Sequence, residues 1–245
     1  MNKIQVHFNN FVNEQRFYNE GSIDEVLEKL KEKNCIYEKD GAVWLKTTKF
    51  GKDDDTVLIK STGEPTYRLP DIAYHKDKLK RGYDLIIDIF GADHNDTYPD
   101  ILSSLHAMGY DTSSIKVLIH QFVSLLRDGQ RVKMSTRKAT FVTLDELVKM
   151  VGVDVVRYFF IMRNRQSHLN FDVGLAEKES DENPVYYLQY AHARICNILK
   201  HAKEIGATDS SSVDLSLIVQ DEELNLVKDL MKWPETMFTA LESLE

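Results

Sequence analysis

The chain has 245 residues, enough for one large domain or for one domain joined to part of another. Its hydrophobic content of 42% suits a globular protein, and its net charge of −8 argues against a module that only coats nucleic acid, because such modules are usually basic. The sequence has no signal-like N-terminus and no apolar run long enough to span a bilayer, so we expect a cytoplasmic protein without a membrane segment.

The two cysteines, Cys35 and Cys196, are far apart and have no CxxC or histidine-rich companion. The sequence therefore predicts reduced thiols, without a disulfide framework or a structural metal.

The first part of the chain has the pattern of a small α+β segment, which we place near residues 1–65. Ser22 and Glu25 have the spacing of a capping box, and apolar residues at helical spacing follow. The predicted elements are a helix from Ser22, a hairpin of residues 36–37 and 42–45 around the turn 38–41, a strand over 56–59, and a helix from about 70 to 82.

From residue 84 onward, strands and helices alternate. Residues 84–90 include five large apolar side chains, the composition of a strand with both faces buried in a parallel sheet. A helix over 97–108 and a strand over 115–119 follow, and a strand–helix–strand unit of this length implies a parallel pair. The next predicted elements are a strand over 121–126, a helix after the capping box of Thr143 and Glu146, and a helix over 154–162.

Composition becomes charged and polar over residues 177–183, and only helices are predicted beyond it, over 184–203, over 221–231 and after Pro234. We place a domain boundary near residue 180, between an α/β domain (1–180) and an all-α domain (181–245). The chain ends within a helical pattern without a cap, so we expect the all-α domain to be truncated.

A basic loop follows the predicted strand over 121–126. Residues 130–140 (QRVKMSTRKAT) contain four cations and three hydroxyl side chains. This composition suits a loop that binds phosphate, because Lys and Arg supply charge while hydroxyls and backbone N–H groups are short donors. A solvated basic face is the alternative.

Residues 91–94 (Gly-Ala-Asp-His) directly follow the strand 84–90, where open α/β sheets bind ligands. Gly91 would let a ligand approach the backbone, and Asp93 could accept hydrogen bonds from ribose hydroxyls or an amine. Alternatively, Asp93 or Asp96 only caps the next helix, and Asp96 fits the cap position better. The remaining interpretation, a metal site of Asp93, His94, Asp96 and Asp100, matches no established spacing.

Tyr67 and Asp71 are four residues apart at the predicted start of a helix. A carboxylate beside a phenol suits a cationic ligand, and a guanidinium pairs with a carboxylate through two hydrogen bonds. From these two residues alone, the simpler interpretation is that Asp71 complements the positive end of the helix dipole.

Lys133-Met134-Ser135 resembles the KMSKS signature of class I aminoacyl-tRNA synthetases. Six further blocks, in the same order, resemble the arginyl-tRNA synthetases: residues 67–75, 90–94, 125–129, 141–147, 151–160 and 183–194. The resemblance is dense over about residues 60–205. It implies the second half of a Rossmann-like parallel-sheet catalytic domain, followed by the first helices of an anticodon-binding domain.

The resemblance implies an arginine–tRNA ligase, which forms arginyl-adenylate from arginine and ATP, with Mg²⁺, and passes arginine to tRNA(Arg). Catalysis then rests on pre-placed cations, since the substrate carboxylate is itself the nucleophile. We expect a monomer. The implied residues are Tyr67 and Asp71 for arginine; Gly91, Asp93, His94, Val132 and Met134 for ATP; Lys133, Ser135 and Arg137 for catalysis; and Arg163, Arg165 and Arg194 for tRNA, although each of these arginines could equally lie on a solvated helix face.

Three departures from the family pattern affect these roles. The second lysine of the signature is Thr136, so Arg137 or Lys138 would supply the transition-state cation. The usual Thr-Arg before Asp71 is Leu69-Pro70, and the usual His-Gly is Asn95-Asp96, which adds negative charge near the pocket.

None of the eight histidines begins the first class I signature, His-x-Gly-His. We therefore expect that this chain alone does not aminoacylate tRNA. Two alternatives remain at this stage: another class I synthetase or an unrelated nucleotidyl transferase, and an RNA-binding or regulatory protein without ligase activity.

Overall fold

The computed structural model describes residues 1–127, 129–132, 142–207 and 214–245. The chain divides into two compact units, one of residues 7–122 and 165–167, and the other of residues 1–6, 123–164 and 168–245. Each unit has its own buried hydrophobic core. The boundary near residue 180 stays a prediction.

The unit of residues 7–122 begins with the small α+β segment. The predicted hairpin is confirmed, and its turn residues Asp40 and Gly41 both have positive φ, 54° and 72°, as a two-residue hairpin turn requires. The helix after Gly21 is also confirmed, but its capping box is wrong. Gly21, at φ 71°, precedes the helix, so Ser22 is already helical and its side chain caps nothing. The elements are α1 (Gln15–Asn19), α2 (Ser22–Glu32), β1 (Ile36–Lys39), β2 (Ala42–Leu45) and β3 (Thr56–Ile59).

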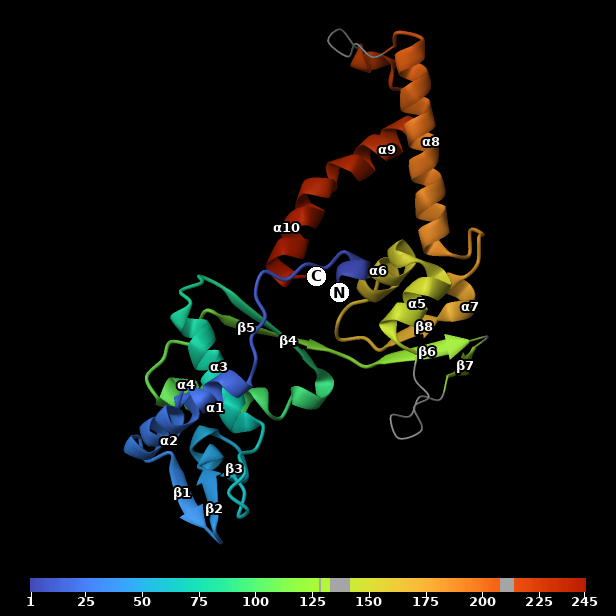
Figure 1. Ribbon diagram of the computed structural model, residues 1–245. Coiled ribbons are helices and arrows are strands. Elements are labelled where there is room, and N and C mark those ends of the chain that lie inside the picture. Colours follow the sequence, from blue (N-terminus) through green and yellow to red (C-terminus); the bar gives the residue numbers. More distant parts are fainter. Residues whose placement is uncertain (128, 133–141, 208–213) are drawn as a thin grey trace. The chain divides into compact units, whose positions relative to one another are not determined.

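The same unit continues with α3 (Arg68–Lys80), β4 (Ile86–Gly91), α4 (Tyr98–Ala107) and β5 (Ile115–His120). Strands β4 and β5 pair in parallel, from Ile86 opposite Ile115 to Gly91 opposite His120, which confirms the predicted parallel pair (Figure 1). Helix α3 packs against α2 and α4. The core of this unit includes Leu30, Leu45, Leu58, Leu69, Ile72, Ile101 and Leu105.

Strand β4 does not bury both of its faces in this unit, so that expectation is wrong. Ile86 and Asp88 are buried, whereas Ile87 and Ile89 are 40% and 67% exposed. The buried face lies against α3, whose His75 side chain contacts Asp88. An apolar run could not reveal which face has neighbours, because exposure depends on contacts from distant parts of the chain.

The other unit has a small mixed sheet. In it, β6 (Val123–Arg127) pairs in parallel with β8 (Leu169–Asp172) and antiparallel with β7 (Gln130–Arg131). Leu125 and Phe171 pack with Leu147 and Phe159 in the core. The short β8 was not predicted. The helices of this layer are α5 (Leu144–Val151), α6 (Val153–Ile161) and α7 (Val173–Ala176).

Helix α5 begins as its sequence predicts. The Thr143 hydroxyl accepts from the Glu146 N–H at 3.1 Å, and a Glu146 carboxylate oxygen accepts from the Thr143 N–H at 2.8 Å. This reciprocal pair satisfies donors that the first helical turn leaves without partners.

The remaining residues of this unit form the predicted helices α8 (Pro184–Glu204), α9 (Asp221–Met231) and α10 (Trp233–Ser243). Together with the parallel strand pairs, they confirm an α/β fold followed by helices. Within the described ranges, no helix is both long and apolar enough to cross a membrane.

Candidate functional site

Asp71 lies in the first turn of α3, which begins at Arg68, two residues earlier than predicted. Its side chain is partly buried, and burial raises the pKa of Asp71 above its ordinary value, partly offset by the positive charges of nearby groups. Among the described residues, no hydrogen bond or ion pair engages this carboxylate. Burial of a carboxylate without a partner costs free energy, and a bound cation would offset that cost.

Tyr67 stands at the N-cap of the same helix, and its carbonyl accepts from the Asp71 N–H at 3.2 Å. The residue is 87% exposed. Tyr67 and Asp71 therefore lie at the start of one helix, and their assignment to arginine stays a prediction.

The carboxyl end of β4 carries the Gly91–His94 segment into a short turn. A Cβ added at Gly91 would lie 2.5 Å from the Asp93 carboxylate, so glycine is what allows Asp93 to fold back on the strand end. The His94 ring stacks on Phe90, with ring centroids 5.1 Å apart and planes 16° apart. The charge of His94 is among those that partly offset the effect of burial on the pKa of Asp71.

Asp96 does not cap α4, contrary to the sequence-based interpretation. The N-cap is Thr97, whose side chain makes no capping bond. The Asp96 carboxylate instead contacts Lys52 at 3.1 Å and Arg68 at 3.6 Å. The negative charge expected near the pocket is therefore offset by two cations.

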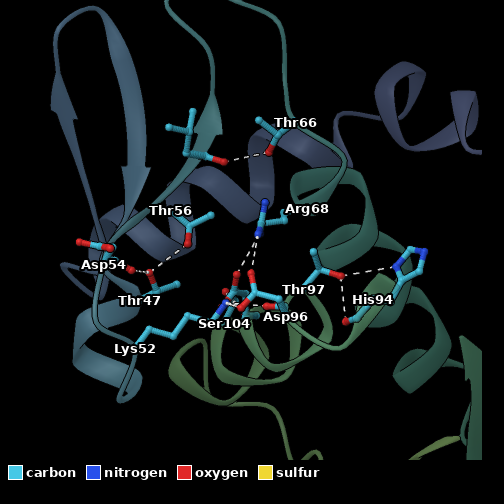
Figure 2. Close-up of polar contacts among 12 residues, drawn as sticks. Thr47, Lys52, Asp54, Thr56, Thr66, Arg68, His94, Asp96, Thr97 and Ser104 are labelled. Carbon is cyan, nitrogen blue, oxygen red and sulfur yellow. Dashed lines mark hydrogen bonds and ion pairs between the residues drawn. The ribbon is translucent and has the colours of Figure 1, made fainter. Parts of the chain in front are cut away.

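Figure 2 shows Lys52 and Arg68 close to Asp96. The same two cations also hold Asp100, a 2% exposed carboxylate in the first turn of α4. Lys52 Nζ lies 2.9 Å from one Asp100 oxygen, and Arg68 Nε lies 2.9 Å from the other. Arg68 is the first helical residue after Tyr67, so the network fixes the start of the helix that carries Tyr67 and Asp71. Sequence reasoning missed Lys52 and Arg68, because the contacts join three separate segments.

The residues assigned to phosphate chemistry, Lys133, Met134, Ser135 and Arg137, lie outside the described residues, as do Thr136 and Lys138. Val132 is described, and its N–H donates to the Leu125 carbonyl at 2.9 Å. A ligand at Val132 would therefore hydrogen-bond to the backbone carbonyl of Val132, because its N–H already has an acceptor.

The three arginines assigned to tRNA have different surroundings. Arg163 is exposed, and the Arg165 carbonyl accepts from the Gln121 N–H at 3.0 Å. Arg194 on α8 donates to the Tyr190 hydroxyl at 3.2 Å and lies over its ring. Their assignment stays a prediction.

A family model described as "tRNA synthetases class I (R), catalytic domain" matches residues 1–173. The chain belongs to the arginyl-tRNA synthetase family. A second model, the DALR anticodon binding domain, matches residues 188–245. Membership in this family excludes an unrelated nucleotidyl transferase.

Curated relatives agree with this membership. An arginine–tRNA ligase of Salinibacter ruber is 51% identical over 240 residues, which are 98% of this chain and 43% of that protein. One of Desulfotalea psychrophila is 53% identical over 236 residues, 96% of this chain and 43% of the relative. The chain thus spans less than half the length of these curated relatives.

Two solved structures have the same fold. An arginyl-tRNA synthetase structure from Campylobacter jejuni superposes with a TM-score of 0.82 at 32% identity, covering 99% of this chain and 52% of that one. The Thermus thermophilus arginyl-tRNA synthetase superposes with a TM-score of 0.78 at 19% identity, covering 99% of this chain and 50% of that one. At this identity the likeness shows the fold alone.

Proposed function

We propose that the protein containing this chain is an arginine–tRNA ligase, which activates arginine with ATP and transfers it from arginyl-adenylate to tRNA(Arg). The proposal includes a cytoplasmic, monomeric enzyme. One observation carries it: the partly buried Asp71 carboxylate has no hydrogen-bond or ion-pair partner in the described structure, and the exposed Tyr67 lies four residues earlier, at the N-cap of the same helix.

The chemistry of this pair suits a guanidinium. Two parallel N–H groups of a planar fork can reach both oxygens of Asp71, and a compact ammonium cannot match that geometry. The ring face of Tyr67 can cover the flat cation through its π-electrons. Binding also relieves the unfavourable burial of an unpaired charge, so the site gains more from a cation than an exposed carboxylate would.

ATP belongs, in this proposal, at the carboxyl end of β4. Gly91, Asp93 and His94 would contact adenosine, and the KMSKS-like loop would face the triphosphate through Lys133, Ser135 and Arg137. Fixed cations there stabilise the charge that develops on the phosphate oxygens during in-line attack by the arginine carboxylate.

Mg²⁺ would enter with ATP. Across the part of the chain that the structure describes, no three His, Cys, Asp or Glu side chains gather in a group that could hold a metal. With nucleotides, Mg²⁺ is usually held mainly by phosphate oxygens and water. When bound, the ion supplies positive charge to the triphosphate. The absence of a structural metal stays a prediction.

tRNA recognition is proposed for the helices α8 to α10, and the match to the DALR anticodon binding domain supports it. Arg163, Arg165 and Arg194 are the candidate phosphate contacts. If they bind the RNA backbone, affinity should fall steeply with salt, and replacing them together should flatten that dependence.

Calorimetric titration of the chain with arginine, lysine and citrulline tests the arginine site. We expect arginine to bind more tightly than either analogue. Asp71→Asn should lower the affinity for arginine at least about tenfold, because a hydrogen bond to a charged group contributes about 1.5–3 kcal/mol. Asp84→Asn is the matched control, since Asp84 is an exposed acid of the same unit. Equal affinity for arginine and lysine, or an unchanged Asp71→Asn variant, would refute the proposal.

A further inference from the structure

His75 is a buried titratable residue that the proposed chemistry does not use. Its side chain, on α3, is 3% exposed and has a polar neighbour at each ring nitrogen. Nδ1 lies 2.7 Å from the backbone carbonyl of Asp71, and Nε2 lies 2.9 Å from a carboxylate oxygen of Asp88 on β4. The ring thus bridges the turn that carries Asp71 and the strand that leads to Gly91.

The neighbours determine which ring nitrogen must donate. The Asp71 carbonyl oxygen only accepts, so Nδ1 carries the proton of that hydrogen bond. At the other side of the ring, Lys78 Nζ lies 3.4 Å from Nε2 and also contacts Asp88. Burial raises the pKa of Asp88, but hydrogen bonds and charge from His75 and Lys78 outweigh burial and hold it below its ordinary value.

An aromatic contact extends the bridge toward the strand end. The His75 ring lies 6.2 Å from the ring of Phe90, and Phe90 stacks on His94. His75 therefore contacts the turn of Asp71 through a hydrogen bond. Its ring also lies near Phe90, the residue on which His94 stacks.

We propose that His75 is a positioning residue of the arginine site, which holds the Asp71 turn of α3 in register with the end of β4. The inference deepens the proposed function and rests on it for the identity of the ligand. The geometry itself, one buried ring with a polar contact at each nitrogen, holds whichever cation binds Asp71.

Asp71 itself makes the site sensitive to pH. Burial raises the pKa of Asp71, so affinity for arginine should fall on the acid side as this carboxylate protonates. The charges that act on Asp71 are those of His75, Glu14, His94 and Lys78.

The first test needs no ligand. In His75→Gln, amide hydrogen exchange in the first turns of α3 should accelerate about tenfold, which corresponds to about 1.4 kcal/mol. Exchange in the last turn of α3 should not change. His106→Gln is the control, because His106 is an exposed histidine of the same unit. Unchanged exchange around Asp71 in His75→Gln would overturn the proposal.

Nitrogen NMR of the ring gives a signature that a merely space-filling role would not produce. In the wild-type chain, Nδ1 of His75 should carry a proton, because the Asp71 carbonyl oxygen can only accept. An Nδ1 without a proton would overturn the inference.

Arginine affinity then separates the two proposals. His106→Gln should bind arginine like the wild type, whereas His75→Gln should bind it more weakly. A wild type that binds no arginine refutes the proposed function, and exchange and NMR still decide on His75. A His75→Gln variant with wild-type affinity overturns the positioning role.

Discussion

Replacing Arg68 with methionine tests whether the buried Asp100 carboxylate fixes the start of α3. Asp100 has one oxygen on Lys52 and the other on Arg68, each at 2.9 Å. Methionine keeps the apolar stem and removes one charged donor. A hydrogen bond to a charged group contributes about 1.5–3 kcal/mol, and removing the sole partner of a buried charge costs about 3–5 kcal/mol. Because Lys52 stays, we expect a loss of about 2 kcal/mol.

The matched control is Asp96→Asn, which alters the same network at its exposed end. The Asp96 side chain is 80% exposed, although it also contacts Lys52 and Arg68. Ion pairs with an exposed member contribute about 0–1 kcal/mol, so this variant should lose less than about 1 kcal/mol.

Urea unfolding measured through Trp44 fluorescence reports on the unit that contains the network. Trp233 belongs to the other unit, so a Trp233→Phe background leaves one probe. With a slope of about 2 kcal/mol per molar urea, Arg68→Met should lower the midpoint by about 1 M. Equal shifts for Arg68→Met and Asp96→Asn would show that burial of Asp100 does not make it dependent on Arg68.

Three further variants test single features. Gly91→Ala should displace the Asp93 carboxylate and lower the affinity for ATP measured by calorimetry, without lowering the urea midpoint. A lower urea midpoint with unchanged ATP affinity would contradict this. Thr143→Ala should cost about 1 kcal/mol in urea unfolding, because the helix cap with Glu146 is lost, whereas serine at that position should restore it. Burial raises the pKa of Asp71, so the folded state favours its protonated form and loses stability as pH rises from about 3.9 through the folded pKa. Asp71→Asn should therefore unfold at higher urea than the wild type at pH 7, with the difference vanishing below about pH 4; a less stable variant at pH 7 would refute this.

Sequence patterns predicted the elements whose causes are local. The hairpin at Asp40-Gly41 and the helix after Thr143 each depend on a few adjacent residues, and both are confirmed. Strand β8 was missed because its four residues are ordered by pairing with β6, more than forty positions away in the chain. Leu169 and Phe171 do alternate with polar residues, and this short alternation is the only local signal that could have indicated β8.

Interpretations of charged residues failed where a residue far away in the sequence determines the contacts of the charge. The local rule for helix caps assigned Asp96 to α4, yet cations from two other segments engage its carboxylate instead. Asp88 was passed over within an apolar strand, although a buried carboxylate there requires a partner such as His75. The sequence around Asp96 does not contain Lys52 or Arg68, and the sequence of strand β4 does not contain His75, so no local pattern could indicate these contacts.

The interpretation of Asp71 shows what burial adds to a motif. From local sequence, complementing the helix dipole was the simpler role, and that role needs no burial. The structure instead withdraws the carboxylate from water without giving it a described partner, an arrangement that costs folding free energy. Proteins retain such a cost mainly where a ligand recovers it. Stability and affinity should therefore change in opposite directions in Asp71→Asn: a variant that folds more stably at neutral pH yet still binds arginine like the wild type would break the link between this burial and the ligand.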